Sequence, residues 1–159
     1  MVDNSGGGQP TGAVYKGLAL GTDAKAGPLL YATNFRSGNV DVFDSNFQPT
    51  TVSGGFTDSK LMHGYAPFGI RNIDGKIWIT YAQQDKAKHD PINKAGHGFV
   101  DVLDGDGNLL QRFAAHAHLD SPWGVALAPA DFGHFAGDFL IGNFGDGSIA
   151  AYDPTSGKW

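Results

Sequence analysis

An internal repeat is the feature that most limits what this chain can fold into. Three segments carry a glycine inside a short apolar run, at Gly17, Gly69 and Gly124, and they recur roughly every 50 residues. Each segment is followed by a second apolar stretch and then by a third stretch that begins at glycine and ends at aspartate. The first stretches are residues 14–20, 66–72 and 121–127, the second are 29–34, 76–81 and 138–143, and the third are 38–44, 98–104 and 147–153.

The third stretches alternate apolar with small or polar residues, which is the period-two pattern of a β-strand. Residues 109–113 predict a fourth strand in the second repeat, and residues 49–52 are a weaker counterpart in the first. Four strands at this spacing predict an all-β chain of three four-stranded β-propeller blades. We expect the apolar strand positions, Leu18 and Leu20 among them, to pack between blades. The approximate blade limits are 14–62, 63–115 and 116–159.

Three blades are too few to close a ring, because known propellers have typically four to eight. The two open sheet edges would be available to pair with another chain. We therefore expect a homodimer that closes a six-bladed ring, since two-fold assembly is the commonest form of homo-oligomer. Residues 1–13 are predicted to be a flexible leader, within which residues 10–13, continuing to Val14, are a candidate closing strand for the partner's last blade. The rival fold, a plain β-sandwich, would not repeat one order of elements three times.

Composition removes several classes of protein from consideration. The 24 glycines and 12% aromatic residues suit short strands joined by tight turns. The formal charge of −5 and the scattered lysines and arginines argue against a nucleic-acid partner. The sequence holds no apolar run of the roughly 20 residues that a membrane span needs. It contains no cysteine, which excludes thiolate metal sites and leaves the cellular compartment open.

Five motifs are specific enough to compare with known proteins: APFG (66–69), YAQQD (81–85), GFVDV (98–102), SPWG (121–124) and GNFGDG (142–147). Together they resemble a family of bacterial propeller proteins of uncharacterised function that is akin to NHL-repeat and gluconolactonase-like propellers. The resemblance covers the chain from Val14 onwards. It implies that the chain is about half of a family member, and it implies no catalytic residues.

Histidines gather in loops that a propeller would place at one end of its channel. Because His116 and His118 are two residues apart, an extended backbone would point both rings to one side. With His63 or His97 they would form a nitrogen ligand set of the kind that zinc prefers. A zinc-bound water could attack an ester, a lactone or a phosphotriester. These four histidines depart from the pattern of the family that the chain resembles, and the alternative is that they are surface histidines with nothing bound.

Oxygen ligands offer a second metal hypothesis. Gluconolactonase-like propellers hold calcium in the channel through Asn, Asp and Glu side chains, and the resemblance places Asn34, Asp85, Asn143 and Asp146 in suitable loops. The absence of glutamate from the sequence weakens this match. The alternative role for Asn34 and Asn143 is to hydrogen-bond loop backbone.

Aromatic residues near the same end are candidates for a ligand pocket. Phe68 and Trp123 stand at the channel end of their strands, where they either line a pocket or pack between blades. The full set of pocket candidates is Tyr65, Phe68, Trp123, Asn34, Asn143, Asp85 and His89. Two functions follow: a metal-assisted hydrolase of small esters, lactones or phosphotriesters, with zinc or alternatively calcium, and a non-catalytic module that binds a small ligand or a protein partner. A fold alone does not separate them.

Overall fold

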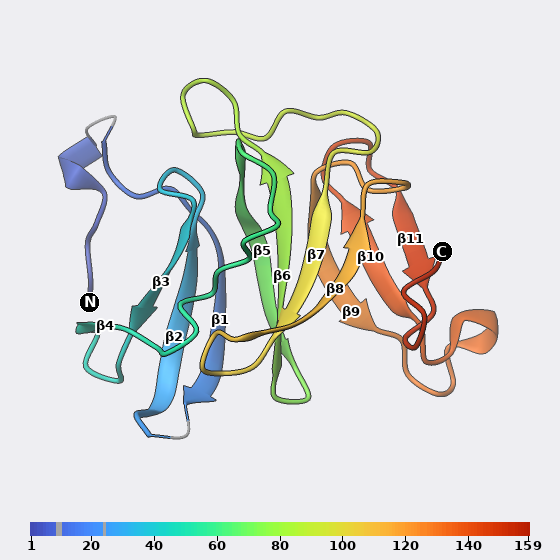
Figure 1. Cartoon of the computed structure of the whole chain (residues 1–159), viewed down its shortest axis with the longest axis horizontal. Helices are drawn as coiled ribbons and strands as arrows, with labels where there is room; N and C mark the ends of the chain where they lie inside the picture. The colour runs from blue at the N-terminus through green and yellow to red at the C-terminus, as the bar shows by residue number, and fades with distance from the viewer. Residues whose placement is uncertain (9–10, 24) are drawn as a thin grey trace.

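The computed structural model describes residues 1–8, 11–23 and 25–159, and every structural statement below concerns those residues. Pro10, which belongs to the predicted closing strand, lies outside them. The chain forms three antiparallel β-sheets and two short 3-10 turns, η1 (Gly6–Gly8) and η2 (Gly133–Phe135). Figure 1 shows the sheets side by side in chain order, with the first at the left and the third at the right. No helix in these ranges is long and apolar enough to cross a bilayer.

Each sheet is a simple meander in which neighbours in sequence are neighbours in the sheet. The first contains β1 (Tyr15–Asp23), β2 (Gly27–Asn34), β3 (Asn39–Phe43) and β4 (Pro49–Thr50). The second contains β5 (Tyr65–Ile73), β6 (Lys76–Gln83), β7 (Phe99–Leu103) and β8 (Leu109–Ala115). The third contains β9 (Pro122–Leu127), β10 (Phe139–Asn143) and β11 (Ile149–Tyr152). The predicted all-β class is therefore confirmed, with a fourth strand of only two residues in the first sheet.

The aspartate that ends each repeat closes a turn after the third strand. Oδ1 of Asp44 accepts a hydrogen bond from the amide of Gln48, and Oδ1 of Asp104 accepts one from the amide of Asn108, both at 2.8 Å. Asp153 does the same for the amide of Ser156 at 2.7 Å. A short carboxylate that binds its own backbone a few residues on favours a turn over a continuing strand. The repeated aspartate is thus a turn signal.

The two larger apolar clusters lie between neighbouring sheets. The first cluster joins the first and second sheets, and its buried members include Tyr31, Val42, Ile77, Ile79 and Leu103. The second cluster joins the second and third sheets, and its buried members include Trp78, Val102, Phe113, Ile141 and Tyr152. Because both faces of the second sheet are covered, every residue of β7 is buried. Alternating side chains of one sheet thus serve two interfaces.

The repeated glycines lie where the first strands of neighbouring sheets approach each other. β5 packs against both β1 and β9. A Cβ atom added to Gly17 would lie 3.1 Å from the amide nitrogen of Ile70, and one added to Gly69 would lie 1.9 Å from the carbonyl oxygen of Trp123. Only glycine allows so close an approach of backbone to backbone. Glycine is therefore a packing requirement at Gly69, whereas at Gly17 the neighbouring atoms are close but not overlapping.

Within a single chain Leu18 and Leu20 do not pack between sheets, because these residues are 62% and 71% exposed. Leu18 follows the repeat glycine, as Ile70 and Val125 do in the next two repeats. Ile70 packs against the first sheet and Val125 against the second. Leu18 has the same orientation, but among the described residues no sheet precedes the first one to cover that face. Leu20, two residues further along the strand, shares that face.

One buried ion cluster ties the loop before β5 to the second sheet. Nε of Arg112 donates to Oδ1 of Asp101 at 2.5 Å, and the guanidinium also pairs with the carboxylate of Asp58. Both carboxylate side chains are almost fully buried, and the guanidinium lies 4.6 Å from the ring centre of Phe99. Burial raises the pKa of Asp101 to about 7.

Candidate functional site

The candidate functional site lies at the end of the sheets where β2, β6 and β10 finish. Each of these strands is antiparallel to the first strand of its sheet, so the first strands begin at this same end. The loops that follow the second strands therefore meet the segments that lead into β5 and β9. This is the upper end in Figure 1, where the long yellow-green loop of residues 84–98 lies. We call this end the mouth.

Five residues are linked by contacts at the mouth and form what we call the mouth cluster: Lys16, Phe35, Phe68, Trp123 and Phe144. Phe68 is buried, with its ring centre 5.2 Å from that of Phe35 and 5.7 Å from that of Phe144. Nζ of Lys16 lies 5.9 Å from the ring centre of Phe35 and 6.0 Å from that of Phe68. Such distances suit cation–π attraction. The two buried phenylalanines form a fixed apolar floor.

Trp123 is half exposed and nevertheless held in place. Its indole Nε1 donates a hydrogen bond to the carbonyl oxygen of Lys16 at 3.0 Å, while half of the residue stays accessible to solvent. The bond joins β9 to β1 although β5 lies between them. Phe144, in the loop after β10, is 60% exposed. The mouth therefore presents two accessible aromatic rings on a rigid support.

The charge of Lys16 is partly balanced within the mouth. Its ammonium lies 3.0 Å from Oδ1 of Asp90, in the 84–98 loop, and Nδ1 of His89 lies 3.0 Å from the other oxygen of that carboxylate. Hydrogen bonds from His89 and then from Lys16 lower the pKa of Asp90. Asp90 is solvent-exposed, so this ion pair is readily rearranged.

Three members of the mouth cluster were not predicted as site residues, namely Lys16, Phe35 and Phe144. The repeat itself contains the signal for them. The position directly before the repeat glycine holds Lys16, Phe68 and Trp123 in the three repeats. Both β2 and β10 end at an asparagine that is followed directly by a phenylalanine. Equivalent repeat positions converge on one end when the sheets pack side by side. Comparing equivalent positions would have selected the whole cluster.

The predicted residues Asn34 and Asn143 are buried and organise the loops at the mouth. Asn34 accepts a hydrogen bond from the amide of Val14 at 3.2 Å. Asn143 accepts one from the amide of Asp120 at 3.0 Å and donates from Nδ2 to the carbonyl oxygen of His118 at 2.7 Å. Their expected role in binding loop backbone is confirmed.

The remaining pocket candidates, Tyr65, Asp85 and His89, make local contacts in and around the 84–98 loop. Tyr65 is half-buried edge-on against Phe99, with 4.8 Å between ring centres. Asp85 accepts a hydrogen bond from the amide of His89 at 2.8 Å and so shapes the 84–98 loop. Asp146, a candidate oxygen ligand, accepts hydrogen bonds from Ser148, and these lower its pKa.

The candidate metal-binding histidines make separate contacts. His116 and Ala117 adopt left-handed backbone angles (φ 56° and 46°), so the segment is a turn and lacks the extended backbone that would point both rings to one side. The ring of His116 packs edge-on against Phe99, whereas that of His118 stacks on Trp159 with 3.7 Å between ring centres. His97 lies near Tyr65, with 6.3 Å between ring centres. The backbone turn sends neighbouring imidazoles to different partners.

His63 is exposed in the segment that leads into β5. Within residues 1–8, 11–23 and 25–159, no group of three or more His, Asp, Glu or Cys side chains is placed to hold a metal ion. The zinc and calcium hypotheses thus remain predictions from the sequence.

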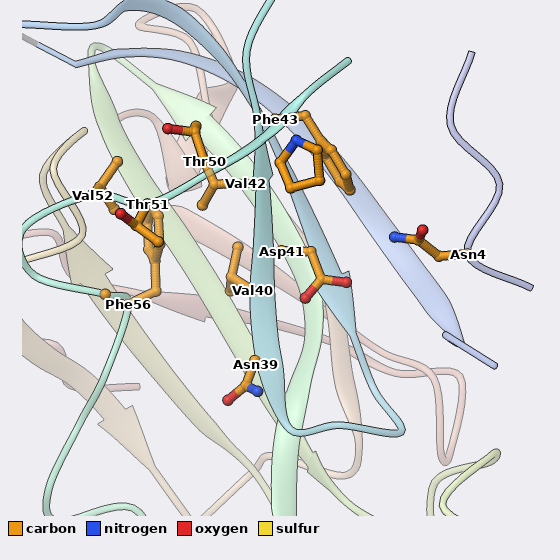
Figure 2. A pocket seen from close by; sticks show the side chains of 12 residues that line it. Asn4, Asn39, Val40, Asp41, Val42, Phe43, Thr50, Thr51, Val52 and Phe56 are labelled. Carbon is orange, nitrogen blue, oxygen red and sulfur yellow. The ribbon is translucent and has the colours of Figure 1, made fainter. Parts of the chain in front are cut away.

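A separate hollow lies on the outer side of the first sheet, away from the mouth cluster. Figure 2 shows Asn4 of the N-terminal segment opposite Asp41 and Phe43 of β3. Its volume is about 510 Å³. The hydroxyl of Tyr15 accepts a bond from Asn4 at 2.7 Å and donates to Asp41 at 2.8 Å. Partial burial raises the pKa of Tyr15 to about 12. This network attaches the N-terminal segment to the sheet.

The fold thus defines an all-β protein of three antiparallel sheets with an aromatic mouth. Its sequence is similar to proteins of Acanthamoeba polyphaga mimivirus. It is 34% identical to uncharacterized protein L690 over 146 residues, and 33% identical to uncharacterized protein R648 over 144 residues. These alignments cover 89% and 88% of this chain but 37% and 35% of the relatives. Uncharacterized protein R640 is 29% identical over 163 residues, which are 29% of its length.

These relatives correct the resemblance drawn from the motifs. The similar proteins are viral, so the assignment to a bacterial family akin to NHL-repeat and gluconolactonase-like propellers is wrong. The chain spans about a third of the length of the curated relatives it matches, where half of a family member was expected. No protein-family model matches the sequence. Short motifs rich in Gly, Pro and aromatic residues reflect sheet packing, which unrelated β proteins share.

Proposed function

We propose that the three sheets are blades of a β-propeller and that the chain is a binding module, which holds a small ligand at the mouth of its channel. The common meander order and the packing of the three first strands along one side support the blade assignment. Packed sheets lie about 10 Å apart, so a flat row would separate β1 from β9 by about 20 Å. Yet the single side chain of Trp123, on β9, reaches the backbone of Lys16, on β1, past the intervening β5. So short a distance between β1 and β9 supports a curved arc of sheets, as in a propeller, over a flat row.

The observation that carries the binding function is the constrained exposure of Trp123. Ligand sites are mostly apolar and largely preformed, with a few polar groups that orient the ligand. The indole is half exposed, yet its Nε1 is fixed on Lys16 and the floor beneath the mouth is buried aromatic surface. A side chain that is already ordered loses little entropy when a ligand binds.

The chemistry of the mouth indicates the class of ligand. The exposed rings of Trp123 and Phe144 offer apolar faces, and the ammonium of Lys16 lies beside the same cluster. A ligand with one flat apolar face, such as an aromatic ring or the face of a sugar, can stack on these rings. An acidic group on that ligand can compete with Asp90 for Lys16.

The three tryptophans provide a direct test by NMR. Each indole N–H gives one resonance: Trp78 is buried between sheets, whereas Trp123 and Trp159 are exposed. Titration with small aromatic compounds and simple sugars should shift the Trp123 resonance saturably and leave the other two in place. The Phe144→Ala variant should weaken that response. Ligands that shift Trp159 but not Trp123 would contradict the proposal.

A further inference from the structure

The outer face of the third sheet repeats the features with which the first two sheets bind a neighbour. At the first two junctions, the repeat glycine faces the backbone of the next sheet, Ile70 in front of Gly17 and Trp123 in front of Gly69. Gly124 is the third glycine of this set, and it pairs with Gly142 across the strands. Among the described residues, no atom lies within 4 Å of a Cβ built on either of these two glycines. The close-approach position is present, but this chain leaves it uncovered.

The apolar side chains around Gly124 follow the same repeat. Leu140, Ile149 and Ala151 occupy the positions that Trp78, Val100 and Val102 take in the second sheet. Those three residues of the second sheet are buried against the third. By contrast, Ile149 is 73% exposed and borders a groove of about 760 Å³. The third sheet thus has a docking face of the kind that the second sheet uses.

The first sheet carries the matching half of such a junction. Leu18 occupies the same position in its repeat as Ile70 in β5 and Val125 in β9. Those two side chains point toward the preceding sheet. Cγ2 of Ile70 lies 3.2 Å from a Cβ built on Gly17, so at this junction the branched side chain fits directly over the glycine. Leu18 is 62% exposed on β1, which belongs to the first sheet, at the other end of the row of sheets from the third (Figure 1). A side chain of the right type and orientation is therefore free to cover such a glycine.

We propose that the outer face of the third sheet docks the first sheet of a second copy of this chain. Leu18 of one copy lies over Gly124 and Gly142 of the other, next to Ile149. We assign a second copy as the occupant because β1 shares three features with β5 and β9, the strands that fill the two junctions within one chain. These features are the repeat glycine, the branched side chain that follows it, and the pairing register. The two faces differ and lie at opposite ends of the molecule, so the contact is head-to-tail (Figure 1). Closure rests on the propeller arc proposed above: with three blades as half of a ring, two such contacts close a pair.

Sedimentation of the whole chain at micromolar concentration tests the assembly. We expect a species of twice the 16.7 kDa chain mass. Because Leu18 and Ile149 are exposed, replacing either with arginine leaves the chain folded, which circular dichroism verifies. Leu18→Arg and Ile149→Arg should each give a monomer, since each places a charge in both contacts of the pair. An equimolar mixture of the two variants should form pairs again, because one contact then joins two unaltered faces.

Leu110→Arg is the matched control. Leu110 is 54% exposed on β8, in the sheet whose two faces are already covered, so this variant should remain a pair. A wild-type chain that sediments as a monomer overturns the proposal. So does a pair that survives Leu18→Arg or Ile149→Arg, dissociation of the Leu110→Arg control, or a mixture of the two face variants that stays monomeric.

Discussion

Gly69→Ala tests whether the repeat glycines are required by the approach of neighbouring sheets. The added methyl group would lie 1.9 Å from the carbonyl oxygen of Trp123 and 2.8 Å from Oγ1 of Thr80. Contacts this short force one partner to move. The nearest atom belongs to the backbone of β9, which is itself paired with β10, so relief requires the third sheet to shift relative to the second.

The cost of Gly69→Ala follows from two opposing effects. Overpacking a well-packed site costs about 1–3 kcal/mol, and a clash with backbone belongs at the upper end of that range. Replacing glycine by alanine also restricts the unfolded chain, which stabilises the fold by about 0.4–1 kcal/mol. The net loss is about 2 kcal/mol. For a chain of this size that corresponds to a decrease in Tm of roughly 4–8 °C.

Urea unfolding measures this loss through the fluorescence of Trp78, which is buried in the cluster between the second and third sheets. All variants are compared at one protein concentration, since self-association shifts apparent stability. Gly17→Ala is the matched control, because its nearest contacts are 3.1–3.2 Å and the neighbouring atoms need to move only slightly. It should change the free energy of unfolding by less than about 1 kcal/mol. Equal stability of the two variants would refute the close-approach argument.

Three further predictions concern the buried polar groups and the histidines. Arg112→Met should lower the free energy of chemical unfolding by about 3–5 kcal/mol, because two buried carboxylates lose their counter-charge. The loss should be larger above pH 7, where Asp101 is ionised, than below it. The control Lys60→Met, at an exposed position, should change the free energy of unfolding little. Asn143→Ala should lower the free energy of unfolding by about 1–3 kcal/mol, since it leaves buried backbone groups of the mouth loops unpaired. Amide hydrogen exchange in those loops should become faster, and unchanged exchange would contradict the role of Asn143. If the metal-assisted hydrolase predicted from the sequence is correct, the purified chain retains a divalent metal and hydrolyses an activated ester, and His116→Ala with His118→Ala abolishes turnover. A metal-free, inactive wild-type chain would contradict that prediction.

The sequence by itself determined the local structure, because local structure depends on neighbouring residues. The period-two stretches became strands at their predicted places, and the aspartates at 44, 104 and 153 closed turns with their own backbone. The buried asparagines were also predictable, since an amide side chain that ends a strand readily binds the adjoining loop.

The tertiary structure decided which side chains meet and which faces stay open. The pattern that predicted buried positions for Leu18 and Leu20 is the same for Ile70 and Val125. Among the described residues, Ile70 and Val125 have a preceding sheet to pack against, and Leu18 and Leu20 do not. The spacing of His116 and His118 suggested one ligand set, and a left-handed turn sent their rings to different partners. The contact between Trp123 and Lys16 joins residues 107 positions apart. Such a contact depends on how whole sheets stack, which no local pattern encodes.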